Sequence, residues 1–187
     1  MRTFIAGLLG GLTLFVWGML AHTVLPLGEA GMRQSKSEDA VIAVLQENMP
    51  ATGVYMVPGL SAEQMADDAA VKAYQEKAPT VPNAMIFYQE SGRDGTQMGR
   101  NLLAEYLCNT LAALLVAIIL VLAPLSKARR ILLSGGLGVF AWLSVSAPYW
   151  NWYRFPQEFS LANLAMLVLG WLLSGAVMAW WLARTGK

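Results

Sequence analysis

The chain has 187 residues, of which 56% are hydrophobic and 13% are charged. A soluble globular domain carries about twice that share of charge, so the composition argues against one. Disorder requires low hydrophobicity with high net charge, whereas the formal net charge here is +1 and the apolar residues gather in blocks. These features are typical of a membrane protein.

Four apolar stretches predict four transmembrane helices, because a helix needs about 20 mostly apolar residues to cross a bilayer. They cover residues 4–25, 102–125, 131–147 and 161–183. The last two show no polar stripe of helical period, which a soluble helix of that length would show. The expected fold class is a membrane all-α protein, a four-transmembrane-helix bundle.

The first stretch has an alternative interpretation as a secretory signal peptide, because Arg2 gives it a basic start. Its apolar run exceeds the roughly 7–15 residues of a signal sequence, and residues 20–25 lack a small-residue cleavage site. A retained helix is therefore favoured. Both interpretations place the following segment on the same side of the membrane.

Basic residues predict that both termini are cytoplasmic, since short cytoplasmic loops carry an excess of Lys and Arg. Three short segments hold six basic and no acidic residues, namely Arg2, Lys127, Arg129, Arg130, Arg184 and Lys187. By contrast, residues 28–100 and 148–160 together hold seven basic and eleven acidic residues. We expect both of these segments outside the cytoplasm. The single cysteine, Cys108, allows no intrachain disulfide there.

Residues 28–100 are predicted to form a small α+β cap outside the cytoplasm, between the first and second membrane helices. Segments 35–38 and 61–64 fit capping boxes, in which a hydroxyl and a carboxylate or amide satisfy free N–H groups at a helix start. The first helix would end at Pro50 and the second near Lys77.

Two β-prone runs, residues 53–57 and 84–88, alternate with these helices and predict a two-stranded sheet. The strands pair either in parallel through a right-handed crossover or antiparallel. A sheet of two strands is marginal in water, so we expect the cap to lean on the membrane helices or on another subunit. Its edges are either docking surfaces or covered by the two helices.

The expected domain organisation follows from these elements. Residues 1–27 form the first transmembrane helix, 28–100 the extracytoplasmic α+β cap, and 101–187 the second to fourth transmembrane helices. Small residues, including Gly7 and Gly11 at a GxxxG spacing, predict close contacts between the helices.

Motifs for catalysis and cofactor binding are not found in the sequence. One His and one Cys exclude a multi-histidine site and argue against structural zinc. No phosphate-binding loop, dinucleotide fingerprint or nucleophile elbow occurs. Basic residues do not cluster with aromatic ones in the part expected outside the cytoplasm, so no nucleic-acid partner is expected. We expect no cofactor, and the lack of a catalytic constellation favours a protein that is not an enzyme.

Five polar residues near the predicted outer ends of the helices form the candidate site, because polar groups in membrane helices are costly and often functional. They are His22, Glu105, Asn109, Arg154 and Asn163. Asn109 follows Glu105 at i+4, on one helix face. We expect the five to line a polar pocket beneath the cap, with Arg154 as partner of Glu105. Structural pairing and a ligand, proton or partner site remain alternatives.

Residues 148–156 are predicted to form an aromatic-rich turn between the third and fourth helices. It contains Tyr149, Trp150, Trp152 and Tyr153. Because Trp and Tyr favour the headgroup region, an aromatic belt at the membrane surface explains this composition. A recognition surface for a lipid or a protein is the alternative.

Two segments carry a resemblance to a known family. Phe15-Val16-Trp17-Gly18 with Val24-Leu25-Pro26-Leu27-Gly28-Glu29, and Tyr149-Trp150-Asn151-Trp152-Tyr153-Arg154-Phe155-Pro156, are similar to signatures of an uncharacterised family of small bacterial four-span inner-membrane proteins. The resemblance implies a bacterial inner membrane. It implies no activity.

These observations favour a non-enzymatic accessory or scaffold subunit that binds the lipid bilayer and a membrane or periplasmic protein, or a second copy of itself. The alternative is a lipid- or small-molecule-binding membrane protein that uses an outer-leaflet polar pocket around Glu105. A transporter is disfavoured, because four spans without inverted repeats would need to oligomerise.

Overall fold

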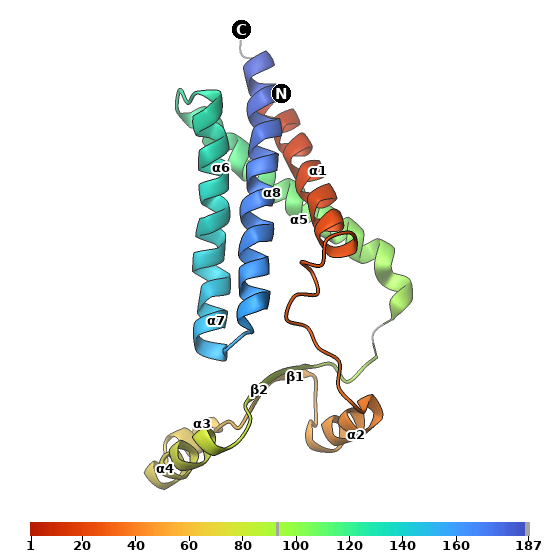
Figure 1. Ribbon diagram of the computed structural model, residues 1–187, viewed down its shortest axis with the longest axis vertical. Helices are drawn as coiled ribbons and strands as arrows, with labels where there is room; N and C mark the ends of the chain where they lie inside the picture. Colours follow the sequence, from red (N-terminus) through yellow and green to blue (C-terminus); the bar gives the residue numbers. More distant parts are fainter. Residues whose placement is uncertain (93, 186–187) are drawn as a thin grey trace. The chain divides into compact units, whose positions relative to one another are not determined.

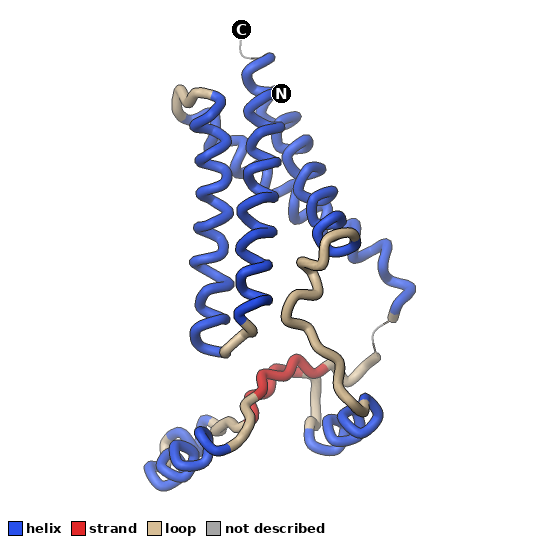
Figure 2. The backbone as a smooth tube through the Cα atoms, in the orientation of Figure 1, coloured by secondary structure: helices blue, strands red, loops and turns tan. Residues whose placement is uncertain are grey.

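The computed structural model describes residues 1–92 and 94–185. The chain divides into two compact units, Met1–Arg33 with Gly95–Lys187 and Gln34–Asp94. We call them the helical unit and the α+β unit, and Figures 1 and 2 show the elements of each.

The helical unit contains the four predicted long helices. Its elements are α1 (Arg2–Thr23), the short turn η2 (Gly95–Gln97), α5 (Met98–Leu122), α6 (Lys127–Ala141), the π-helical turn η3 (Trp142–Ser146), α7 (Ala147–Tyr153) and α8 (Gln157–Arg184). With η2 joined to α5, and η3 and α7 joined to α6, four helices of 22 to 28 residues are long and apolar enough to cross a membrane. The prediction of four such helices is confirmed.

The helices pack in the order α5, α1, α8, α6. α1 lies against both α5 and α8, and α8 lies against both α1 and α6 (Figure 1). α5 crosses α1 obliquely and does not pack along α6 over their described lengths, 98–122 and 127–141. α1, α5 and α8 share one core, and α6 packs on α8.

Glycines allow the close approach of α1 to α5. A Cβ on Gly11 would lie 2.5 Å from the Thr110 Cα atom, and a Cβ on Gly7 would overlap Leu114. Helices in a membrane gain little from the hydrophobic effect, so their association depends on such contacts between backbones. The predicted role of the Gly7–Gly11 spacing in helix packing is confirmed.

Small residues also form the other two helix contacts. The Ser174 hydroxyl on α8 donates a hydrogen bond of 3.1 Å to the Gly10 carbonyl on α1. Where α6 meets α8, a Cβ on Gly138 would lie 2.7 Å from the Leu167 carbonyl oxygen. Apolar side chains from α1, α5 and α8 complete the core, namely Ala6, Ala113, Val116, Ala117, Leu120, Met178 and Leu182.

The third helix is longer than predicted, and the aromatic turn is mostly helical. It continues through η3 and α7 to Tyr153, where Arg154 ends it in a left-handed conformation (φ 55°, ψ 40°). Pro148 has no N–H to donate, and proline usually kinks a helix interior. The wider π-turn directly before Pro148 provides the local change in winding that accompanies such a proline.

The α+β unit contains both predicted strands at the predicted positions. Its elements are α2 (Glu38–Asn48), β1 (Gly53–Val57), α3 (Ala62–Met65), α4 (Asp68–Lys77), the 3-10 turn η1 (Ala78–Thr80) and β2 (Ala84–Tyr88). The strands pair antiparallel, with Tyr55 opposite Ile86, which decides between the two pairings that the sequence left open.

One of the two predicted capping boxes is confirmed. Ser61 Oγ accepts from Gln64 N at 3.2 Å and Gln64 Oε1 accepts from Ser61 N at 2.9 Å. The helix that follows breaks after Met65, and a carboxylate oxygen of Asp67 accepts from Ala69 N at 2.9 Å to begin α4. The other box, 35–38, was wrong, because α2 begins only at Glu38 and Ser37, the residue before it, makes no capping hydrogen bond with its side chain.

The α+β unit has almost no interior. Among its described residues, 34–92 and 94, Met49 is the only one that is buried. Chain ordering costs about 1–2 kcal/mol per residue, and burial of apolar surface is the main term that offsets it. This unit buries little, which agrees with the expectation that a cap of this size forms only a small core.

Candidate functional site

Two of the five candidate residues lie together on α5. Asn109 Nδ2 donates a hydrogen bond of 3.0 Å to Glu105 Oε1, which their place on one helix face at i+4 allows, and the pair is exposed. The amide orients the carboxylate but does not neutralise it. Over residues 1–92 and 94–185, no ion pair joins Glu105 to Arg100, Arg154 or His22.

The other three predicted site residues lie apart from this pair. Asn163 on α8 accepts a hydrogen bond of 2.6 Å from the Ser146 hydroxyl on η3, which closes the α6–α8 contact. His22 packs on Gly28, where a Cβ would overlap the imidazole ring. Arg154 caps α7. In the described part of the chain, the five residues form no single hydrogen-bonded cluster.

The register of α1 against α5 explains why Arg154 does not meet Glu105. Gly11 lies on Thr110, and the Phe15 and Tyr106 rings stack edge to face at 5.7 Å between centroids. Glu105 is therefore level with Val16, seven residues before the end of α1, or about 10 Å along the helix. Arg154 belongs to the turn beyond that end, where Gly31 packs on Pro156 and Phe159.

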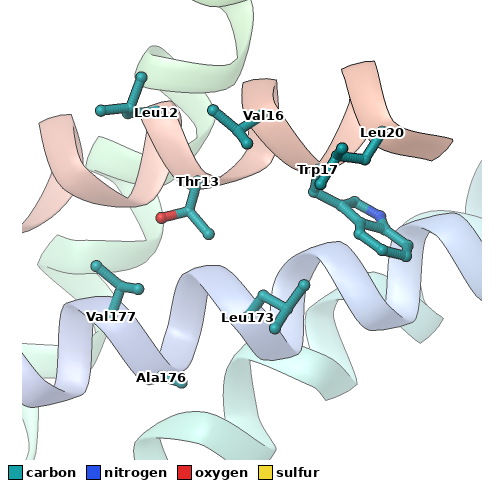
Figure 3. Close-up of a pocket in the computed structure, with 8 residues that line it drawn as sticks. All are labelled: Leu12, Thr13, Val16, Trp17, Leu20, Leu173, Ala176 and Val177. Carbon is teal, nitrogen blue, oxygen red and sulfur yellow. The ribbon is translucent and has the colours of Figure 1, made fainter. Parts of the chain in front are cut away.

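A groove between α1 and α8 is the second candidate site. It has a volume of about 440 Å³ and is lined by Leu12, Thr13, Val16, Trp17, Leu20, Leu173, Ala176 and Val177 (Figure 3). The Thr13 hydroxyl donates to the Leu9 carbonyl at 2.8 Å, and Trp17 Nε1 donates to the Met166 carbonyl at 2.9 Å. Both polar groups are occupied, so the groove offers an apolar surface, and none of the five predicted polar residues lines it.

The aromatic residues predicted as a turn are displayed by a helix end. The rings of Tyr149, Tyr153, Phe155 and Phe159 form a continuous stack, with centroids 5.5 to 5.6 Å apart. Trp150 is exposed, and Trp152, with 77% of its surface exposed, projects furthest. Stacking holds one side of this segment in place and leaves the indole rings free to contact lipid or a partner.

Apolar side chains of the α+β unit form a surface that the sequence did not single out. Val54 lies opposite Phe87, and Met56 opposite Met85, so the four share one face of the β-ribbon. Val54 is 58% exposed and Phe87 is 66% exposed. On α2, Val41, Ile42 and Val44 are also exposed. Both strands are continuous runs of apolar residues, without alternation of apolar and polar side chains. This pattern was the signal that both faces of the ribbon are apolar.

Comparisons with known proteins return no relative. No protein-family model matches the chain, and no curated protein or solved structure matches it either. Within the described residues, no three side chains of His, Cys, Asp or Glu gather where they could hold a metal ion.

Proposed function

We propose that this chain is a multi-pass protein of the bacterial inner membrane and a non-enzymatic accessory or scaffold subunit for another membrane or periplasmic protein. Four helices of sufficient length and apolarity support the membrane location. The excess of Lys and Arg at the termini and at 127–130 supports cytoplasmic termini, with the α+β unit on the periplasmic side. The bacterial origin rests on the resemblance of residues 15–29 and 149–156 to small four-span proteins.

One observation carries the binding role: the β-ribbon displays an apolar face and the unit that bears it encloses almost no core. Val54, Met56 and Phe87 are all exposed there. Exposed apolar patches rimmed by polar residues are characteristic of interaction sites. The α+β unit also carries nine acidic and four basic residues between 34 and 94. This balance favours a protein partner with a basic surface over an anionic lipid surface.

The test is purification of the full chain from native membranes in a mild detergent, followed by mass spectrometry of the intact complex. We expect a second protein in fixed stoichiometry. Phe87→Asp on the ribbon should release it, whereas Ala73→Asp, at an exposed position on helix α4, serves as the control and should not. A chain that purifies alone, or that keeps its partner with Phe87→Asp, would contradict the proposal.

A second candidate function, binding of a lipid or another small apolar molecule, is favoured by the groove between α1 and α8. Its volume and apolar lining suit an acyl chain better than a polar ligand. Leu173→Trp would fill the groove and should displace a bound lipid seen in the mass spectrum of the intact protein. Leu132→Trp, at an exposed position on α6, is the control.

A further inference from the structure

Glu105 presents a carboxylate on the mostly apolar helix α5, and no ion pair joins it to a cation within residues 1–92 and 94–185. Over the described residues, its side chain is hydrogen-bonded to Asn109, one turn away on the same helix. Leu102, Leu103 and Leu107 near it are exposed, whereas Tyr106 faces Phe15 of α1, so α1 covers one side of this section of α5 and leaves Glu105 uncovered. This inference rests on the proposed function and names the chemistry of the partner.

The level of Glu105 makes its exposure costly if α5 crosses a membrane. It lies opposite Val16, about 10 Å from the end of α1 along the helix, so it would lie below the membrane surface if the end of α1 marks that surface. A carboxylate in the hydrocarbon region is expensive unless it is paired, hydrated or protonated. Asn109 provides one hydrogen bond and leaves the other carboxylate oxygen available.

No Lys or Arg of this chain lies level with Glu105 on the helices. The apolar stretches 4–25, 102–125, 131–147 and 161–183 contain no Lys or Arg, His22 packs on Gly28, and Arg100 lies five positions before Glu105, about 140° around the helix. A second copy, docked on α5 about a twofold axis, would bring its own Glu105 to the same level. Like charges at one contact repel, so the charge pattern argues against a homodimer through this face.

We propose that α5 docks a membrane helix of a different protein that carries a Lys or Arg level with Glu105. The hydrogen bond from Asn109 holds the carboxylate in place for that cation. Ala104, Cys108 and Ala112 follow one another at i+4 beside Glu105, and such small residues let a partner backbone approach closely. Charge complementarity provides the specificity of the contact, since an uncharged helix would leave the carboxylate unpaired.

Cys108, the only cysteine and an exposed one, makes the contact measurable. The full chain would be reconstituted in phosphatidylcholine vesicles with a synthetic Leu/Ala membrane helix. This probe carries one Lys seven residues from the end of its apolar stretch and one Cys four residues further on. A short thiol-reactive linker joins Cys108 to the probe where the helices meet. The control probe has Leu in place of Lys.

We expect the Lys probe to be cross-linked at least about threefold more than the Leu probe, the ratio that an average interhelical polar contact in a membrane gives. Glu105→Gln, which keeps the shape of the side chain and its contact with Asn109, should bring the ratio to one. Glu158→Gln, at an exposed carboxylate in the first turn of α8, should leave it unchanged. An unchanged thermal transition would confirm that both variants fold.

Equal yields with the two probes, or a preference that survives Glu105→Gln, would overturn the proposal. If cross-links between the Cys108 residues of two copies predominate and the Lys probe does not reduce them, this face of α5 contacts a second copy. That result would also overturn the proposal. The native complex separates this inference from the proposed function. No partner at all contradicts the proposed function, whereas a partner that Glu105→Gln retains contradicts only the role of α5.

Discussion

Trp17 Nε1 donates a hydrogen bond of 2.9 Å to the carbonyl oxygen of Met166, 149 positions further along the chain. Gly170 allows this contact, since a Cβ there would lie 2.8 Å from Trp17 Cδ1. The indole ring therefore lies over a glycine and reaches the backbone of the neighbouring helix. The first and last long helices are joined by a specific polar contact in addition to packing.

The first prediction concerns this bond. Trp17→Phe keeps a ring over Gly170 but removes the donor, and it should lower the free energy of unfolding by about 1 kcal/mol. Titration with a denaturing detergent from mild micelles would measure the loss. Trp152→Phe is the control, because Trp152 is 77% exposed and should change stability by less than about 0.5 kcal/mol. Equal effects of the two substitutions would contradict the assignment.

The second prediction compares two glycines of α1. Gly11→Ala places a Cβ 2.5 Å from the Thr110 backbone, so α1 and α5 must separate, at a cost of about 1–3 kcal/mol. Gly18 has nothing within 4 Å of its Cβ position, so Gly18→Ala should cost nothing and favours the helix by up to about 1 kcal/mol. The same unfolding titration applies. A loss of stability with Gly18→Ala as large as that with Gly11→Ala would contradict the close contact of α1 with α5 at Gly11.

The third prediction separates the partners of Glu105 by double-mutant cycles. Glu105→Ala and Asn109→Ala remove one shared hydrogen bond, so their losses of stability should be non-additive by roughly 0.5–1 kcal/mol. Glu105→Ala and Arg154→Ala should add within about 0.5 kcal/mol, because no ion pair joins these residues in the described chain. Strong coupling of Glu105 to Arg154 would restore the pairing that the sequence predicted.

The fourth prediction is the topology. A reporter enzyme that is active only in the periplasm should be active when fused after Gly59 and silent when fused after Leu125 or at the C-terminus. The reason is the concentration of Lys and Arg at both ends and at 127–130. The reverse pattern of activity would invert the proposed orientation and place the β-ribbon in the cytoplasm.

The fifth prediction is that residues 30–98 do not fold as an isolated fragment. Met49 is the one buried residue among those described between 34 and 94, so ordering the chain gains too little apolar burial. Circular dichroism during heating should show a gradual change. A cooperative transition would mean that this segment is stable without the rest of the chain or a partner.

Local sequence signals predicted the elements whose ends depend on local chemistry. The strands at 53–57 and 84–88 lie between glycines and prolines, and the Ser61–Gln64 capping box depends on residues three apart. The third helix was misjudged because Pro148 and its aromatic neighbours are typical of a turn. In the folded chain, η3 accommodates the proline, and the stack from Tyr149 to Phe159 covers the helix end.

The candidate site depended on tertiary register and was predicted only in part. Hydropathy places Glu105 about one turn inside its apolar stretch, since the stretch begins at Leu102. The contacts of Gly11 with Thr110 and of Phe15 with Tyr106 move it deeper relative to α1. No local pattern encodes that offset, so the pairing of Glu105 with Asn109, fixed by helical spacing, was predictable and its separation from Arg154 was not.

The order of the helices in the array has a consequence for biosynthesis. α1 is made first and α8 last, yet the Ser174 hydroxyl must reach the Gly10 carbonyl. Until α8 has been synthesised, α1 can pair with α5 but not with α8. The side of α1 that contacts α8 stays uncovered until the α6–α8 hairpin is complete. Each of the pairs α1–α5 and α6–α8 can therefore form its own contacts before the two pairs meet, and the short link 123–126 joins them. Two polypeptides divided within that link retain every contact of each pair, so they hold the information needed to assemble after separate synthesis.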